Sequence, residues 1–459
     1  MSSAPSKHDI FVENARAFAQ CNGLLVGAPD GKSLVHAPFS LYPTEFPAEA
    51  FCDAQNASYL LNNLYDRVSR DEEFLRESLA TVAETDEFTR KLIECLPEKP
   101  QQLRANIFRS DYMLHVPTEG KPHFLQVELN TIAASFAFLS QRVSLWHMHS
   151  NRDSGVLLPK QGTQRTFALL QRAAYEHAQR NSLSGRPLIV FVVQPEERNA
   201  TDQRHLQFFL ESGEEGCDVA RVPLGQLQVN TDGHVEVDGR VASLVYFRSA
   251  YTPVDYPTEQ EWTARAALER SSAVLVPCVA SQLAGTKKVQ QLLTQPSVLR
   301  RFLSNDEVQR LLPFFAPMYS LSIDEVGEEA VNQIVETVIA NPDDFVLKPQ
   351  REGGGCNFYG ADAVEKLRQL SPRERAAFVL MKRIRPAPRT ACLVTASGVS
   401  EGPCLNEVGF FSSIVSDADS VLCEAVGGHL VRTKHVGVNE GGVNTGYAVL
   451  DSPGLVSRD

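Results

Sequence analysis

The amino-acid sequence predicts an α/β fold, because short buried strands occur in the same chain as long amphipathic helices. The run LIVFVV at 188–193 lies between Pro187 and Pro195, a pattern typical of a parallel strand buried on both faces. A second apolar run occupies 242–247. Between Tyr59 and Leu96, apolar residues recur at helical spacing with charges at the other positions, which indicates two or three amphipathic helices. The 459 residues are enough for two or three domains.

Composition restricts the partners and the compartment. The formal net charge of -12 argues against binding to nucleic acid or to an anionic membrane surface. The nine cysteines form no C-x-x-C pair, which indicates reduced thiols rather than disulfides or a zinc site. The N-terminal MSSAPSKHDI has no apolar h-region, and no stretch approaches the length of a membrane-spanning helix. We therefore expect a cytoplasmic protein with no nucleic-acid or membrane partner.

The chain opens with a helical pattern at 10–25 and a proline-rich stretch at 37–50 that reads as a loop. The strand expected at 124–130, FLQVELN, then carries candidate ligands, because alternation places Gln126, Glu128 and Asn130 on one face. A polar strand face is most often only solvated. Together with Glu352, however, Glu128 and Asn130 offer the oxygen ligands that Mg²⁺ prefers.

Polar residues follow both buried strands at the end where ligands bind in open α/β sheets. After the first strand come Glu197, Arg198, Asn199 and Gln203, and after the second come Arg248 and Tyr251. Taken alone, the first group reads as a polar loop, and Tyr251 fits a core position equally well. Arg109, at the expected end of a strand upstream, reads by itself as a surface charge.

The stretch FVLKPQREGGGCNFYG at 345–360 is a strand that ends at Lys348 and leads into three consecutive glycines. It is not a Walker A loop and lacks the G-x-G-x-x-G spacing. A lysine at a strand end, followed by a carboxylate and mobile backbone N–H donors, suits a loop that closes over nucleotide phosphates and their magnesium. The alternative is an ordinary glycine-rich turn. Lys287 follows Gly285 and Thr286 and opens a helix that ends near 295–296. It likewise fits two interpretations, a lysine that binds phosphates or a simple helix start.

The C-terminal part adds further polar groups. A strand is expected at 377–384, Glu407 lies on a strand at 405–410, and Arg432 and Lys434 alternate onto one face of HLVRTK. The glycine-rich VGVNEGGVNTG at 436–446 follows, and by itself this segment could be a surface turn.

Together, VELNTIAASF at 127–136, ERNATDQR at 197–204, QLAGTKKVQQ at 282–291, FVLKPQREGGG at 345–355 and HLVRTK at 429–434 give the chain a specific resemblance. From Ala37 to Asp451 it resembles the eukaryotic-type glutathione synthetase family of ATP-grasp ligases. The resemblance implies a main domain at 1–186 and 403–459, an inserted parallel-sheet substrate domain at 187–300 and a lid with the glycine loop at 301–402. It also implies a homodimer.

The resemblance implies a role for each candidate residue. Magnesium would bind Glu128, Asn130 and Glu352, and the catalytic side chains would be Arg109, Lys348 and Arg432. ATP would contact Glu128, Lys287, Lys348, Gly353, Gly354, Gly355, Asn357, Tyr359, Met381, Lys382, Arg383, Ile384, Glu407, Lys434 and Glu440. The peptide and the acceptor would contact Arg109, Ile132, Ala133, Ala134, Ser135, Glu197, Arg198, Asn199, Gln203, Arg248, Tyr251, Arg432, Val443 and Asn444.

The implied reaction is the ATP-dependent ligation of γ-glutamylcysteine to glycine through an acyl phosphate, giving glutathione, ADP and phosphate. The chain departs from the family pattern at Ala133, Cys356 and Lys382, and at Asn444 and Thr445, where the family commonly has alanines. The last pair motivates one alternative, the same chemistry with serine or β-alanine as acceptor. The other alternative is a non-catalytic ATP-binding regulator.

Overall fold

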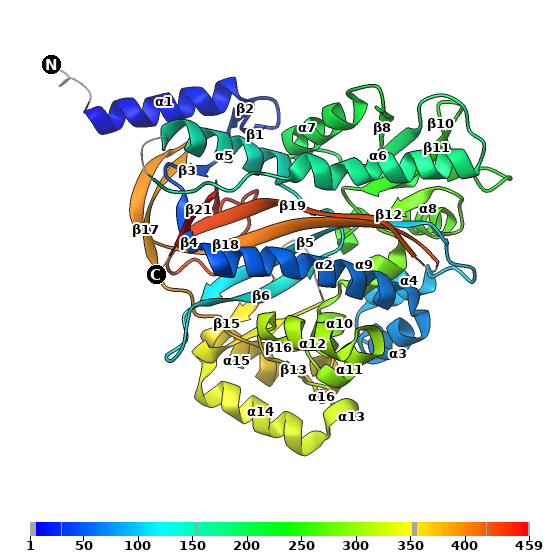
Figure 1. Ribbon diagram of the computed structural model, residues 1–459. Helices are drawn as coiled ribbons and strands as arrows, with labels where there is room; N and C mark the ends of the chain where they lie inside the picture. The colour runs from blue at the N-terminus through cyan, green and yellow to red at the C-terminus, as the bar shows by residue number, and fades with distance from the viewer. Residues whose placement is uncertain (1–5, 29, 152–154, 351–355, 419, 458–459) are drawn as a thin grey trace.

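The computed structural model describes residues 6–28, 30–151, 155–350, 356–418 and 420–457. They form an α/β fold with three principal sheets, which confirms the predicted fold class (Figure 1). The seven-stranded main sheet has the strand order β17-β3-β20-β19-β18-β5-β6. Its strands are β3 (Phe39–Ser40), β5 (Arg104–His115), β6 (His123–Asn130), β17 (Arg389–Thr395), β18 (Gly398–Asp417), β19 (Ser420–His435) and β20 (Val449–Asp451).

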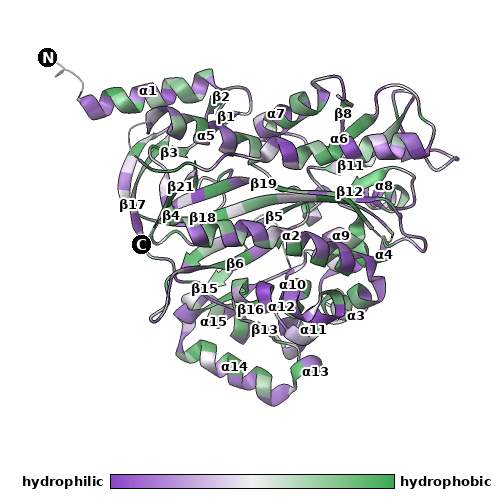
Figure 2. Cartoon of the chain, viewed as in Figure 1, coloured by the Kyte–Doolittle hydropathy of each residue, from purple (hydrophilic) through white to green (hydrophobic). Residues whose placement is uncertain are grey.

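Helices cover both faces of the main sheet. Phe51 of α2 (Ala48–Arg70) packs on Phe410 at a ring distance of 4.9 Å. On the other face, Phe167 of α6 (Thr163–Arg180) lies 6.0 Å from Phe411, and α5 (Ala137–Ser150) lies beside α6. Apolar and polar residues alternate around these helices, as Figure 2 shows for α6, because only one side of each is buried.

Further elements surround this sheet. The predicted region 59–96 forms the end of α2 and the two helices after it, and the predicted loop at 37–50 instead contains β3 and β4, which pairs with β21. These elements are α1 (Lys7–Cys21), β1 (Leu25–Gly27), β2 (Leu34–His36), β4 (Thr44–Pro47), α3 (Glu72–Ala83), α4 (Glu87–Glu94) and β21 (Pro453–Val456). Local sequence could not show β3 and β4, because they pair with β20 and β21 from the opposite end of the chain.

The inserted sheet contains both predicted buried strands, β7 (Leu188–Val192) and β11 (Arg240–Phe247), which pair in parallel. β8 (Asp218–Val222) and β12 (Val274–Val276) extend the parallel part, and β9 (Gln228–Val229) and β10 (Val235–Val237) continue it antiparallel. The helices of this part and of its connection to the lid are α7 (Ala200–Glu211), α8 (Glu259–Glu269), α9 (Val279–Ala284), α10 (Lys287–Leu292), α11 (Pro296–Phe302) and α12 (Asn305–Leu311).

The lid sheet is antiparallel, with the order β13-β16-β14-β15, and lies at the bottom of Figure 1. Its strands are β13 (Met318–Ser320), β14 (Phe345–Lys348), β15 (Phe358–Tyr359) and β16 (Val379–Lys382). Its helices are α13 (Ile323–Val326), α14 (Glu328–Ala340), α15 (Gly360–Gln369) and α16 (Pro372–Arg375), with a small core that includes Leu321, Val338, Leu347, Leu367 and Leu380.

The alternation predicted for 124–130 is wrong at its centre. The register between β5 and β6 shifts, because Asp111 pairs with Glu128 whereas Tyr112 pairs with Gln126. Val127 is therefore the extra residue of a β-bulge. Gln126 turns away from the face of Glu128 and donates to Ser110 Oγ at 2.6 Å.

Across the described parts of the chain, every helix falls short of the length and apolarity that crossing a lipid bilayer requires. Cys95, Cys217, Cys278, Cys392 and Cys404 are buried free thiols.

Candidate active site

A cavity of about 510 Å³ lies between the main sheet, the lid sheet and the loop that follows β7. Most of the predicted site residues line it. They are Arg109, Glu128, Asn130, Ile132, Ala133, Ala134, Ser135, Glu197, Arg198, Tyr251, Lys348, Asn357, Tyr359, Met381, Lys382, Arg383, Ile384, Glu407, Arg432, Lys434, Glu440, Val443 and Asn444. The predicted Glu352, Gly353, Gly354 and Gly355 lie outside the described residues.

Two lysines meet the main sheet at β6. Lys287, the first residue of α10, donates from Nζ to Glu128 Oε2 at 2.8 Å. Lys348, at the end of β14, donates from Nζ to the Val127 carbonyl at 2.8 Å and so joins the lid sheet to β6. Burial alone would raise the pKa of the Glu128 carboxyl, but the charges of Lys287 and Lys348 lower it well below its usual range. Glu128 is therefore an anion at neutral pH.

Two hydrogen bonds from its amide nitrogen orient the Asn130 side chain. Its Nδ2 donates to the Arg109 carbonyl at 3.2 Å and to Asp111 Oδ2 at 3.0 Å. Both N–H bonds therefore point to β5, and the amide oxygen of this cavity-lining residue is the atom that could serve as a ligand.

The donor set at β6 fits a magnesium ion that also binds phosphates. Within the described ranges, His, Cys, Asp and Glu side chains form no group of three or more that would hold a metal by itself. Mg²⁺ commonly uses only one or two carboxylates and completes its shell with phosphate oxygens and water. Glu128 and Asn130 supply oxygen atoms of this kind side by side on one wall of the cavity.

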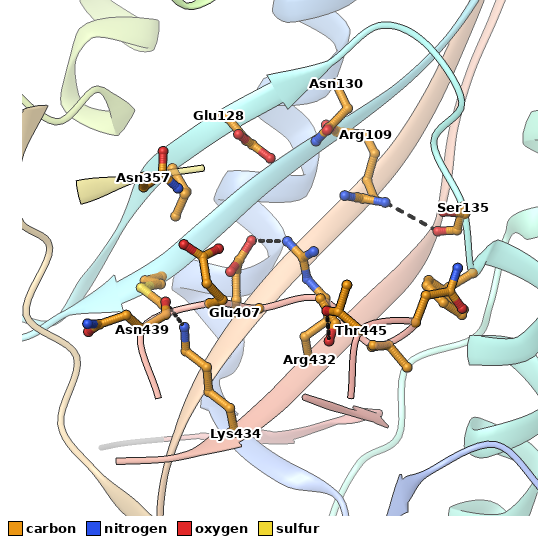
Figure 3. A pocket seen from close by; sticks show the side chains of 18 of the residues that line it. Arg109, Glu128, Asn130, Ser135, Asn357, Glu407, Arg432, Lys434, Asn439 and Thr445 are labelled. Atoms are coloured by element: carbon orange, nitrogen blue, oxygen red, sulfur yellow. Dashed lines mark hydrogen bonds and ion pairs between the residues drawn. The ribbon is translucent and has the colours of Figure 1, made fainter. Parts of the chain in front are cut away.

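A buried charge cluster occupies the floor between β5, β18 and β19. Arg109 donates from Nε and Nη2 to the two oxygens of Asp111 at 2.7 and 2.8 Å. Arg432 donates from Nη2 to Asp111 Oδ2 at 3.0 Å and also to Glu407, and Figure 3 shows the Arg432 and Glu407 side chains pointing toward each other. The cluster thus contains two arginines and two carboxylates.

The cluster shifts the ionisation of its members. Burial would lower the pKa of Arg432, but the carboxylates of Glu407, Asp111 and Glu128 raise it. Burial raises the pKa of Glu407 despite the nearby Arg432. Burial also lowers the pKa of Lys434, whose Nζ donates to the Asn439 carbonyl (Figure 3).

The glycine-rich loop at 436–446 closes one side of the cavity. Thr445 Oγ1 donates to the Gly442 carbonyl at 3.0 Å, so this hydroxyl stabilises the loop itself. Arg198 Nη1 donates to the Asn444 carbonyl at 2.9 Å and ties the loop to the segment after β7. The Asn444 side chain, rather than Thr445, is therefore the polar group that can vary the shape of this wall.

The end of β16 forms another wall. The N–H groups of Lys382 and Arg383 bond to the carbonyls of Pro317 and Asp344 at 2.9 and 2.7 Å, within the lid part of the chain. The Arg383 guanidinium lies 5.7 Å from the centre of the Tyr359 ring. A base bound here would therefore be read by other backbone groups of 381–384.

Four predicted residues lie behind the wall and contact lining residues. Glu197 accepts from the Asn199 backbone N–H at 2.7 Å and from Gln203 Nε2 at 3.2 Å. Arg248 Nη1 donates to the Ala134 carbonyl at 3.0 Å. The fourth residue is Lys287, which contacts the lining residue Glu128.

Sequence reasoning missed two buried aspartates at this site. Asp111 could have been suspected, because it is two residues from Arg109 and so shares its strand face. Asp202 of α7 gives no local signal, because it accepts the backbone N–H groups of Phe136, Phe138 and Leu139 at the start of α5, at 2.8, 3.0 and 3.0 Å. Those residues are more than sixty positions away.

Comparisons with known proteins agree over nearly the whole chain. The sequence profile of the family described as eukaryotic glutathione synthase, ATP binding domain, matches residues 5–455. Glutathione synthetase of Xenopus laevis is 38% identical over 94% of this chain and 92% of its own length, and that of Homo sapiens is 36% identical over 91% and 90%. A chloroplastic glutathione synthetase of Arabidopsis thaliana is 36% identical over 97% of this chain and 85% of its own.

The fold has a solved counterpart. The apo structure of a glutathione synthetase-like effector from Globodera pallida superposes with a TM-score of 0.78, covering 99% of this chain and 98% of the other. Its sequence identity is 21%, so the likeness concerns the fold alone.

Proposed function

This chain belongs to the eukaryotic glutathione synthetase family, and from this premise we propose that it joins γ-glutamylcysteine to glycine with ATP, giving glutathione, ADP and phosphate. The observation that carries the proposal is the charge distribution of the cavity. The described residues that line it include seven cations, Arg109, Arg198, Lys348, Lys382, Arg383, Arg432 and Lys434, and five carboxylates, Glu128, Glu196, Glu197, Glu407 and Glu440, in a chain whose net charge is -12. The site therefore suits anionic substrates such as ATP and a peptide carboxylate.

Activation of the peptide carboxylate is the first chemical requirement, because amide formation in water is unfavourable. Lys287 and Lys348 approach β6 from α10 and β14 and would hold the phosphates of ATP as fixed cations. Glu128 and Asn130, with Glu352 outside the described residues, would hold Mg²⁺, which offsets phosphate charge when it is bound. Arg109 would bind the carboxylate that receives the γ-phosphoryl group.

The resulting acyl phosphate must be protected from water until the amine attacks. The loop at 436–446 borders the cavity. The glycine loop at 353–355, which lies outside the described residues, would close over the site, and closure of such loops excludes water. Arg432 would bind the carboxylate of the incoming amino acid. Arg109 would then stabilise the oxyanion of the tetrahedral intermediate, a contribution of about 3 to 4 kcal/mol per donor in other enzymes.

The remaining assigned roles follow the walls of the cavity. The nucleotide would lie between the lid and main sheets, against Asn357, Tyr359, Met381–Ile384, Glu407, Lys434 and Glu440. The peptide would lie along 132–135 toward the loop after β7, with Arg248 and Gln203 holding that wall from behind. Glycine would fit beside Val443 and Asn444.

The test is ADP release by the purified protein with Mg-ATP and γ-glutamylcysteine, offering glycine, β-alanine and serine separately and weighing each product by mass. We expect glycine-dependent turnover that yields glutathione, and none with Lys348→Met, which lacks a phosphate-binding cation. Preference for β-alanine or serine would assign the acceptor differently. No turnover with any acceptor, together with retained ATP binding, would support a nucleotide-binding regulator instead.

We also propose that the protein acts in the cytoplasm as a homodimer. The buried free thiols favour a reducing compartment. Light scattering of the purified protein would test the dimer, and a tagged full-length chain would test the compartment.

A further inference from the structure

Asp111 has no role in the reaction proposed above, although its carboxylate bonds to three residues of the proposed machinery. It lies on β5, is completely buried, and accepts four hydrogen bonds. The donors belong to Arg109, Arg432 and Asn130. We propose that Asp111 is the positioning residue that fixes both substrate-binding arginines relative to each other; this inference rests on the proposed function.

The first step concerns Arg109. Its guanidinium meets Asp111 through two parallel bonds of 2.7 and 2.8 Å, the geometry that fixes both position and plane. A third bond, from Nη1 to the Ser135 carbonyl at 3.3 Å, ties the same group to the peptide-binding segment (Figure 3). Arg109 therefore has one orientation, with Asp111 setting it from the strand side.

The second step concerns Arg432, which comes from a different strand. Both its bonds to carboxylates, Asp111 and Glu407, run through Nη2. Among the described residues this leaves the N–H groups of Nε and Nη1 available to a ligand carboxylate. Glu407 lies directly opposite Arg432 on the neighbouring strand β18, so its bond does not bring Arg432 nearer to β5. The bond to Asp111 instead directs the Arg432 guanidinium across β18 toward Arg109.

The third step is how Arg432 reaches β5 at all. β18 separates β19 from β5, and the residue of β18 that pairs with Asp111 is Gly409. A Cβ atom at 409 would lie 2.6 Å from Asp111 Oδ1 and 2.9 Å from Arg109 Cδ. The glycine therefore opens the space in which one carboxylate serves two arginines from strands on either side.

A purely structural ion pair would also be buried and costly to break, so the test must separate positioning from stability. Asp111→Asn keeps the shape and removes the charge. Asp66→Asn is the matched control. Asp66 lies on α2, is also buried, pairs with Arg70 at 3.1 Å and accepts from Ser416 of β18 at 2.7 Å. We expect both variants to lower the melting temperature.

Steady-state kinetics would then distinguish them. Asp111→Asn should raise KM for glycine and lower kcat by roughly 10- to 100-fold, the usual effect of losing a residue that orients a binding group. KM for ATP should rise less, because Asp111 reaches the proposed metal site only through its bond from Asn130. Asp66→Asn should leave kcat and the KM values for glycine and for ATP at wild-type values. A wild-type glycine KM in Asp111→Asn, or equal effects on both KM values, would overturn the inference. An inactive wild-type protein would instead contradict the proposed function.

A double-variant cycle adds a readout that stability does not move. In the Arg432→Ala background, Asp111→Asn should raise the glycine KM much less than it does alone, because its partner is already gone. Additive effects would overturn the inference. If Asp111→Asn does not fold, Asp111→Glu keeps the charge but displaces it, and is expected to show the same separation of the two KM values; an unchanged glycine KM would again contradict positioning.

Discussion

The charge cluster depends on a residue that carries no side chain. The backbone of Gly409 lies so close to Asp111 and Arg109 that a Cβ atom there would be 2.6 and 2.9 Å from their side chains, which is below ordinary contact distances. An alanine at 409 must displace the carboxylate, the guanidinium or the strand. The backbone of β18 pairs with β5 on both sides of this position, so the strand resists movement and the side chains are the groups that shift.

Gly409→Ala is therefore expected to reduce glutathione formation by about 10-fold or more. Overpacking should also lower the free energy of unfolding by about 1 to 3 kcal/mol. Gly402→Ala is the control on the same strand, because its Cβ would lie 3.6 Å from the His435 ring, an ordinary contact. Steady-state rates and urea unfolding measure both effects, and equal activity of the two variants would contradict this account.

At this scale the sequence predicts the residue types of the site but not their connections. Strand alternation and family resemblance identify Arg109, Glu128, Asn130, Arg432 and Lys348, and all five line the cavity. Strand alternation could place Asp111 beside Arg109 but not beside Arg432, which is 321 positions away. A buried carboxylate is recognised as a positioning group only when strand order is known.

Among the elements, α5 shows how one helix start builds a wall of the cavity. The residues before it, Ala133 and Phe136, have positive φ values of 51° and 70°, which are unfavourable for non-glycine residues. Asp202 of α7 compensates, because its carboxylate accepts three backbone N–H groups at the helix start. The segment 132–135, which lines the cavity, therefore depends on a cap from another part of the chain.

Asp202→Ala is expected to lower the free energy of unfolding by about 1 to 2 kcal/mol, as for a lost helix cap. It should also raise KM for γ-glutamylcysteine more than KM for ATP, since only the peptide wall loses its support. Asp86→Ala is the control, because Asp86 caps α4 through the Thr89 N–H at 2.7 Å and does not line the cavity. If both variants showed the same peptide KM, the cap would have no part in substrate binding.

The elements that can be predicted are those with a strong local pattern. The apolar runs at 188–193 and 242–247 are β7 and β11, and the lysine after Gly285–Thr286 begins α10. The bulge at Val127 and the full length of β18, Gly398–Asp417, are not predictable, because cross-strand register rather than hydrophobic pattern sets them. The start of α5 is also unpredictable, since the residue at its N-cap position is Phe136.

At the scale of the whole molecule, both ends of the chain complete the main sheet. β3 pairs with β20 in parallel, and His147 of α5 joins the last residue of β3 to the residue that follows β20. Its Nε2 bonds to the Ser40 carbonyl at 2.9 Å, and its Nδ1 bonds to Ser452 Oγ at 2.6 Å. A neutral imidazole satisfies both bonds, with Nε2 donating and Nδ1 accepting from the hydroxyl. Protonation would remove that acceptor inside the core.

This arrangement predicts how stability depends on pH. Burial lowers the pKa of His147 from 6.5 to about 4, so between these values the unfolded chain binds a proton that the folded protein does not. The contribution of His147 to the free energy of unfolding is therefore fully present above pH 6.5. Below that pH it decreases by about 1.4 kcal/mol per pH unit until the folded-state pKa is reached.

The variant His147→Gln removes this titration. The free energy of unfolding in urea should then lose about 2 kcal/mol less than that of the wild type between about pH 7 and pH 5. Parallel curves for His147→Gln and wild type would show that the pKa of His147 is the same in the folded and unfolded states, and would contradict a neutral His147 that holds the two segments together.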